Sequence, residues 1–287
     1  MTTLDAVIVA AMGVTALYLW YSTSRELYYE WDWSVIPQYL VFQEETGDWR
    51  TNILFHGIFA TLRLTVWATL IALAAGIMGA FFRTSQSLFL RLIGTSFVGL
   101  IRNVPPLIFI FVVYFFLSSQ ITPLLGITDW AAGLEGDSKL FVEFLFGPTV
   151  LIENFLAGLL VLGFFEAAYF TEIIRAGLQS VEKGQWEAAR SIGLSRHKVM
   201  RYVIMPQAIQ RTIPPLAGEL ISLVKNSSMV SLISVQDLTY SGSQVANSTR
   251  KVFEIWIFIA VVYFVICFLL SLGSRWLEAH MGRGIRR

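Results

Sequence analysis

The chain has 287 residues, of which 55% are hydrophobic and 14% are charged, and its mean hydropathy is +0.63. Soluble domains usually carry about 25% charged residues, so this composition excludes an ordinary soluble protein, and its high hydrophobicity also excludes disorder. The 21 basic and 20 acidic residues nearly cancel, which argues against a nucleic-acid partner. One cysteine, Cys267, and three scattered histidines predict neither a disulfide nor a metal site. The composition indicates a helical integral membrane protein embedded in a lipid bilayer.

Six apolar segments are candidates for membrane-spanning helices. A spanning helix needs roughly 20 mainly apolar residues, and residues 64–82 and 255–274 contain no charge. We therefore predict an all-α integral membrane protein with six spans, at about residues 4–21, 56–82, 104–119, 150–170, 213–235 and 255–274. No basic segment precedes the first of these and no small-residue cleavage site follows it, so we expect a retained helix rather than a signal peptide.

The charged residues predict the orientation of these spans. Residues 83–103, 171–212 and 275–287 hold 14 of the 21 basic residues, whereas residues 22–52 and 120–149 are rich in Asp and Glu. Because cytoplasmic loops of membrane proteins carry the excess of Lys and Arg, both termini are predicted to be cytoplasmic. The chain then divides into an N-terminal helix with an outside loop, a transmembrane core and a basic cytoplasmic tail, which occupy residues 1–52, 53–274 and 275–287.

The cytoplasmic loop at about 171–212 has a pattern of its own. Residues 185–192 favour a short helix, Gly193 can end that helix in a left-handed conformation, and Ser195 can cap a second helix. Prolines are expected to bound the stretch after that cap, and these are Pro206, Pro214 and Pro215. The prediction is two short helices that lie along the membrane surface.

The first of these helices offers a surface for a partner. Ala188 and Ala189 would leave a flat face that another protein could approach closely, with Glu187 and Arg190 as polar anchors. A solvated amphipathic linker accounts for the same residues equally well. The residue types alone leave both interpretations open.

The spacing in this loop resembles a known motif. Glu187, Ala188 and Ala189 are followed after three residues by Gly193, and Pro206 comes later in the expected register. This pattern resembles the EAA motif of ABC importer permeases, with two mild departures in which Val203 replaces Ile and Met205 replaces Leu. The stretches AAYFTEIIRAGLQSVEKGQWEAA and LVKNSSMVSLISVQDL are similar to the polar amino acid uptake branch, the histidine/glutamine permease family. The likeness covers about residues 53–274.

The resemblance implies a bacterial cytoplasmic (inner) membrane protein with a five-helix type I ABC importer permease core and one extra N-terminal helix. It also implies an import complex with a second permease subunit, two ATP-binding subunits and a periplasmic or extracellular amino-acid-binding protein. The coupling contact to the ATPase would be made by Glu187, Ala188, Ala189, Gly193 and Pro206. Since the chain has no GxxxxGK[ST] phosphate loop, ATP and Mg are expected on the partner, with no cofactor and no catalytic residue in this chain.

Charged residues within the predicted spans are candidates for the substrate path, because charges in a bilayer are costly and often functional. Glu166 could hold the ammonium group of an amino acid, although a structural carboxylate paired with another helix explains it equally well. Lys225 could contact substrate or pair across a subunit interface. Glu219 lies six residues before Lys225, about 240° around a helix, so the two are not expected to pair.

A secondary, ion-coupled transporter is the main alternative, with Glu166, Glu219 and Lys225 as a proton relay. Such carriers often contain inverted repeats, and no internal repeat is recognisable here. A membrane-embedded enzyme is disfavoured because no nucleophile is found with a base. Residues 187–206 separate these classes, since only an ATPase-coupled permease gives that segment a role. The sequence does not specify the amino acid or whether the second permease is an identical chain.

Overall fold

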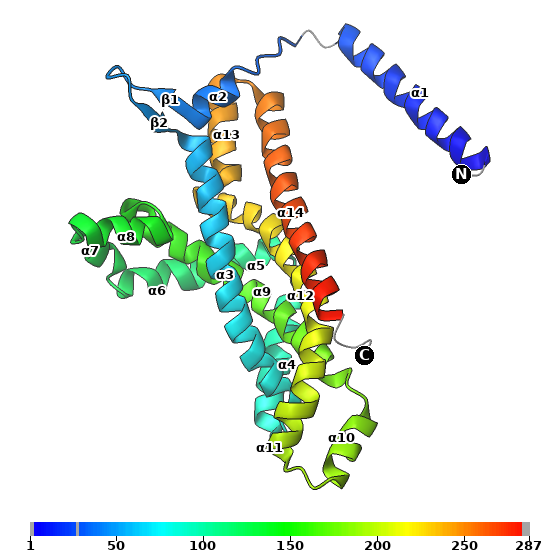
Figure 1. The fold of residues 1–287 in the computed structure, drawn as a ribbon. Coiled ribbons are helices and arrows are strands. Elements are labelled where there is room, and N and C mark those ends of the chain that lie inside the picture. Colours follow the sequence, from blue (N-terminus) through cyan, green and yellow to red (C-terminus); the bar gives the residue numbers. More distant parts are fainter. Residues whose placement is uncertain (1–2, 27–28, 283–287) are drawn as a thin grey trace.

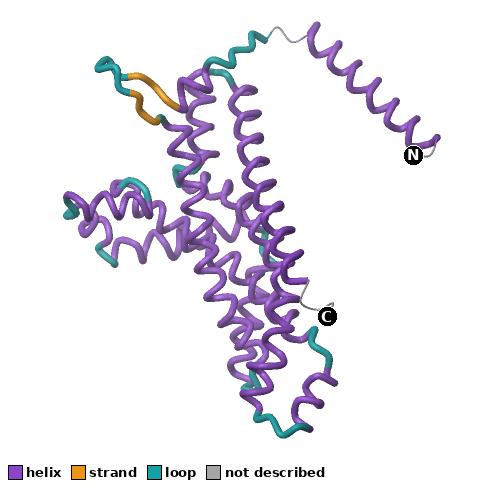
Figure 2. The backbone as a smooth tube through the Cα atoms, in the orientation of Figure 1, coloured by secondary structure: helices purple, strands orange, loops and turns teal. Residues whose placement is uncertain are grey.

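The computed structural model describes residues 3–26 and 29–282 and is almost entirely helical, with one small two-stranded ribbon (Figures 1 and 2). In the described residues, four helices are long and apolar enough to cross a membrane, or five when one bent pair counts as a span. The long helices are α3 (Ile53–Thr84), α9 (Ile152–Gln179), α12 (Met205–Ser227) and α14 (Val252–Gly282).

The bent pair consists of α4 (Leu88–Arg102) and α5 (Pro106–Val113), which meet at 113°. A helix does begin at Pro106, as predicted for residues 104–119, but it reaches spanning length only together with α4. The loop expected at 83–103 is wrong, because Leu88–Arg102 is helical. Pro105 disfavours helical geometry at the residue before it, while Pro106 suits the first turn of a new helix. The chain turns there and continues through a π-helical turn, η1 (Tyr114–Ser118), into α6 (Ser119–Leu124).

The two ends of the bundle carry different short elements. One end, called here the ribbon end, carries α2 (Val35–Leu40) and the antiparallel strands β1 (Val41–Gln43) and β2 (Trp49–Thr51) (Figure 1). The opposite end, the hairpin end, carries the segment between α9 and α12. Further short helices project sideways from the middle of the bundle: α6, α7 (Ile127–Ala132), α8 (Gly136–Phe146) and η2 (Thr149–Leu151).

The first helix, α1 (Thr3–Glu26), confirms the prediction of a helix at residues 4–21. Figure 1 shows it apart from the bundle. Its apolar part, Thr3–Tyr18, is shorter than the four long spans.

The packing of α3 on α9 builds the centre of the molecule. A Cβ atom added to Gly76 would lie 2.6 Å from the Cβ of Phe170, and one added to Gly163 would lie 2.8 Å from Ile71 Cγ2. Both positions therefore require glycine for the helices to come this close. Fully buried Leu64 and Leu162 fill the space beside this contact.

The stretch after α12 completes the bundle at the ribbon end. A 3₁₀ segment, η4 (Ser228–Ile233), leads to α13 (Leu238–Thr249), which packs between α3 and α14. Asp237 caps α13, because its Oδ1 accepts a hydrogen bond from the Tyr240 backbone N–H at 2.8 Å. The predicted span at 213–235 therefore lies mostly within one longer helical path, Arg196–Ile233, and α13 is an additional helix that the sequence did not predict.

A buried carboxylate fixes the N-terminal segment to the bundle. Glu254, at the start of α14, is 0% exposed; its side chain accepts hydrogen bonds from the Tyr29 hydroxyl and, at 2.7 Å, from the Asp32 backbone N–H. Burial and the bond to Glu254 raise the pKa of the Tyr29 hydroxyl to about 12, so it remains a donor. Lys251 adds a bond from Nζ to the Glu30 carbonyl at 2.7 Å.

Replacement of Glu254 by Ala is expected to release residues 29–34 from the bundle. The Tyr29 hydroxyl and the Asp32 N–H would lose their acceptor, which costs about 1–3 kcal/mol for each buried group left unpaired. Hydrogen–deuterium exchange in this peptide should become at least about tenfold faster. Glu30→Ala is the control, because Glu30 makes its contact through the backbone; equal exchange in both variants would contradict the role of Glu254.

Candidate functional site

The segment at the hairpin end is more helical than its sequence suggests. It contains α10 (Lys183–Ser191), α11 (Arg196–Val199) and a π-helical turn, η3 (Met200–Ile204), which runs directly into α12 (Figure 1). Residues 171–179 of the predicted loop belong to α9, and residues 205–212 belong to α12. The residues outside helices are only 180–182 and 192–195. We call residues 180–204 the coupling hairpin, after the coupling role that the resemblance predicts for them.

The coupling hairpin separates the two alanines of the motif. Ala188 is exposed together with Glu187, whereas Ala189 is only 4% exposed and packs with Val181, Val199 and other apolar residues. The expected flat face made of both alanines is therefore wrong, because successive residues of a helix point about 100° apart. One alanine anchors the helix and the other faces outward.

Gly193 has the conformation that the sequence predicts. Its φ is +82°, and no atom lies within 4 Å of a Cβ placed there, so the backbone conformation rather than space requires glycine. Its N–H donates to the Arg190 carbonyl at 2.9 Å, and the Leu194 N–H donates to the Ala189 carbonyl at 3.3 Å. Ser195 occupies the cap position of α11, as predicted, but its hydroxyl makes no capping bond.

The prolines do not bound separate helices. Pro206 lies in the first turn of α12, and Pro214 and Pro215 lie inside it, within one helical path from Arg196 to Ile233. The expected second short helix along the membrane surface is therefore wrong. Pro206 has no N–H to give to the preceding turn, and the π-helical η3 stands where that hydrogen bond is missing, which lets the helix continue.

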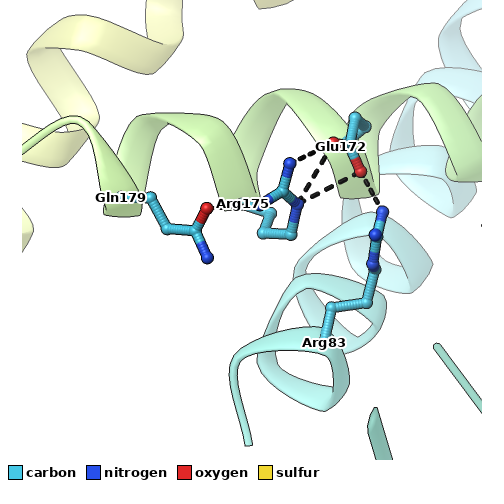
Figure 3. Close-up of polar contacts among 4 residues, drawn as sticks. All are labelled: Arg83, Glu172, Arg175 and Gln179. Carbon is cyan, nitrogen blue, oxygen red and sulfur yellow. Dashed lines mark hydrogen bonds and ion pairs between the residues drawn. The ribbon is translucent and has the colours of Figure 1, made fainter. Parts of the chain in front are cut away.

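An ionic cluster joins α3 to α9 near the hairpin end (Figure 3). Glu172 forms ion pairs with Arg83, from the last turn of α3, and with Arg175, one turn further along α9. Arg175 also donates to the Gln179 side chain. Sequence reasoning missed this cluster because residues from 171 onward were assigned to a loop. The spacing of three between Glu172 and Arg175 was the only available signal.

Glu166 lies at the middle of α9, 14 residues after Ile152 and 13 before Gln179, rather than near its inner end as the predicted span at 150–170 implies. It is 0% exposed, and its Oε1 accepts a hydrogen bond from Asn226 Nδ2, on α12, at 2.9 Å. Its Oε2 has no hydrogen-bond partner within the described chain. The half-buried carboxyl of Glu219 lies near enough to interact with it electrostatically.

Lys225 and Glu166 are not brought together as a pair. Lys225 is exposed near the end of α12, and in the part of the chain that the structure describes no ion pair includes it. Its charge acts on Glu219 only from a distance. Asn226, which sequence reasoning did not select, is the residue that contacts Glu166.

Replacement of Glu172 by Gln is expected to destabilise the protein, because the two half-buried arginines would lose the carboxylate that they share. A loss of about 1–3 kcal/mol is expected for charged groups left without a partner. It should lower the midpoint of thermal unfolding of the detergent-purified protein. Glu182→Gln, an exposed position beside α10, is the control, and an equal midpoint in both variants would show that the cluster does not stabilise the fold.

A helical bundle with a carboxylate such as Glu166 buried between its spans is typical of membrane transport proteins. Several transport proteins are similar to the chain over most of its length. It is 36% identical over 230 residues to GlnM of Bacillus subtilis, which is named as a probable glutamine ABC transporter permease. The aligned residues cover 80% of this chain and 94% of GlnM. It is 31% identical to the L-cystine transport system permease TcyB of the same species, over 82% of this chain and 89% of TcyB.

Solved structures share the fold. One chain in the crystal structure of an amino acid ABC transporter with histidines is 30% identical to this protein, with a TM-score of 0.67. The superposition covers 88% of this chain and all of that one. The methionine transporter MetNI in an inward-facing conformation is 17% identical with a TM-score of 0.57, over 80% of this chain and 96% of that one. This second likeness concerns the fold alone.

The family of binding-protein-dependent transport system inner membrane components matches residues 71–283, which is more than half of the chain. The chain therefore belongs to this family. It is a multi-pass inner membrane protein and a permease subunit of an ABC importer of the polar amino acid class, as the sequence predicts. Subunits of this kind translocate the solute and are not catalytic.

Proposed function

We propose that the chain forms the translocation path of an importer for a polar amino acid and couples that path to two separate ATPase subunits through the coupling hairpin. ATP and Mg²⁺ would bind to those subunits, a second permease would complete the path, and a binding protein would deliver the solute. The observation that carries this proposal is the exposed surface of α10, where Glu187 and Ala188 are free to contact a partner while Ala189 anchors the helix.

The contacts of the coupling hairpin support a mechanical role. Arg211, on α12, donates to the Ser180 carbonyl at the end of α9. Gln207, also on α12, donates to the Gln185 side chain of α10 at 3.3 Å. Movement of α10 would therefore be passed to α9 and α12 together, and these are the helices that carry Glu166 and Asn226. A rigid-body shift of packed helices is a common way to transmit such movement.

The relatives support the substrate class. GlnM and TcyB are named for glutamine and cystine, and GltJ of Escherichia coli, 29% identical over 83% of this chain and 89% of that protein, is named for glutamate and aspartate. These solutes share an ammonium and a carboxylate group. Glu166 would attract the ammonium group, and exposed Lys225 would lie at the side where a second permease completes the path.

The same proposal includes six spans, with both termini and the coupling hairpin in the cytoplasm and the ribbon end outside. α1 has 24 residues, about 36 Å of helix, and in this proposal the residues after its apolar part, Thr3–Tyr18, complete the crossing. The basic residues around the hairpin, Lys183, Arg190, Arg196 and Lys198, support this orientation.

Replacement of Ala188 by Trp is expected to leave the protein in the membrane but to abolish ATP-driven uptake, because the indole would hold the ATPase away from α10. In a mild-detergent pull-down, this variant should lose a phosphate-loop ATPase that the unmodified chain retains. The control is Lys139→Trp, at an exposed position on α8, away from the coupling hairpin. This variant should retain the ATPase.

The matched substitution Ala189→Trp should instead reduce the amount of folded protein, because Ala189 is buried and overpacking costs about 1–3 kcal/mol. Gly193→Pro should behave like Ala188→Trp, since proline cannot adopt a φ of +82°. Normal uptake with Ala188→Trp would contradict the coupling role. Uptake by the purified chain alone, without ATP, would indicate a secondary transporter.

Replacement of Glu166 by Gln is expected to lower ATP-driven uptake by about 10- to 100-fold, the effect of losing one charge-assisted hydrogen bond of about 1.5–3 kcal/mol. Gln keeps the size of the side chain and an oxygen for Asn226, so the folded fraction should be unchanged. Uptake is measured in proteoliposomes that contain the whole complex. Glu153→Gln, near the start of α9, is the control; unchanged uptake in Glu166→Gln would assign Glu166 a structural role.

A further inference from the structure

A second polar site lies toward the ribbon end, separate from Glu166. It is a cavity of about 410 Å³, within the range of roughly 300–1,000 Å³ that small-molecule sites occupy. Three segments line it: the start of α3, residues 146–155, and residues 235–241. Asn154, in its wall, precedes Glu166 on α9 by 12 residues, which is about 18 Å along the helix.

The charged group of this cavity is Arg63, on α3. Arg63 is half-buried, and in the described part of the chain no hydrogen bond or ion pair satisfies its guanidinium. The two carboxylates of the segment that borders the cavity bond elsewhere, since Glu143 accepts from the N–H and hydroxyl of Thr149, and Glu153 accepts from Thr128. A partly buried arginine within a membrane helix normally has a partner, so the cavity is suited to an anion.

The other side chains that line the cavity determine which kind of anion fits beside Arg63. The lining contains the amide side chains of Asn52, Asn154 and Gln236, and no Asp or Glu. The Asn52 amide already bonds to the Gln38 carbonyl and the Ile53 N–H. This leaves Asn154 and Gln236 as the amides able to face a solute. Asn154 gives its amide nitrogen to the Ser234 carbonyl at 3.3 Å, which leaves its oxygen as an acceptor for an ammonium or amide group. A guanidinium beside neutral amides matches a solute that has one carboxylate and other polar groups.

We propose that this cavity is an entry subsite in which Arg63 binds the carboxylate of a polar amino acid before the solute moves toward Glu166. This inference rests on the proposed function. A guanidinium and a carboxylate can form two parallel hydrogen bonds. Because no acidic side chain lines the cavity, neutral and acidic amino acids bind there in preference to those with a cationic side chain.

The test measures protection of a cysteine placed in the cavity wall. Leu151→Cys, in the apolar part of the cavity wall, is made in a Cys267→Ser background, which removes the chain's only natural cysteine. The whole permease–ATPase complex is assembled in nanodiscs without binding protein. A neutral, water-soluble maleimide labels the cysteine. Saturating glutamine should slow labelling at least about tenfold, whereas 4-aminobutanamide, which lacks the carboxylate, should have no effect. Arginine should protect less than glutamine.

A second set of variants tests the role of Arg63. Arg63→Gln should weaken protection by glutamine about 10- to 100-fold, the loss expected for one charge-assisted hydrogen bond, and Arg63→Lys should restore part of it. Arg50→Gln, on the ribbon and paired with Glu44, is the control. If Arg63→Gln does not fold, the comparison of glutamine with 4-aminobutanamide on the Leu151→Cys protein still decides the question.

Three results would overturn the subsite. These are equal labelling with and without glutamine, equal protection by the two compounds, and labelling that depends on phosphatidylglycerol in the nanodisc but not on glutamine. The last result would assign the cavity to a lipid phosphate. If the subsite fails while the unmodified complex still takes up glutamine with ATP, only this inference is lost. Absence of ATP-driven uptake by the unmodified complex would contradict the proposed function itself.

Discussion

The close contact between α3 and α9 is the constraint on which the rest of the structure depends. Gly76 and Gly163 allow the two helices to approach within side-chain distance, and this fixes their register. The same register brings Arg83 to Glu172 near the hairpin end. Elsewhere on α3, the Trp67 Nε1–H donates to the Leu145 carbonyl in the last turn of α8, with an N–O distance of 3.0 Å. The close contact with α9 therefore accompanies an ion pair, and a hydrogen bond ties α3 to the short helices as well.

The second organising feature is the direct connection of the coupling hairpin to two spans. Because α9 runs into the hairpin and α12 continues directly from it, only residues 180–182 and 192–195 lie outside helices between α10 and these two spans. The apolar cluster of Val181, Ala189, Val199, Ile204 and Ala208 holds the hairpin against them. In the proposed coupling role, movement of α10 would reach α9 and α12 through these contacts.

Opposite charges lie at different depths of the bundle. Arg63 faces a cavity toward the ribbon end, and Glu166 lies near the middle of α9 with Asn226 as its partner. Both are charged residues among apolar helices, where each group without a counter-charge is costly. An amino acid carries both complementary charges, so the arrangement is consistent with a solute that is held first by its carboxylate and then by its ammonium group.

The sequence by itself determined the class of the protein, because hydrophobic length, the distribution of Lys and Arg, and the spacing from Glu187 to Pro206 are local properties that packing does not change. It also determined the left-handed turn at Gly193. Only the tertiary structure decided that α4 and α5 meet at a sharp angle, that Ala189 is buried, and that the helix continues through Pro206. The contacts of Glu166 with Asn226, and the cavity at Arg63, join residues that lie far apart in the chain. Such pairings depend on the register between helices, which short-range patterns do not specify.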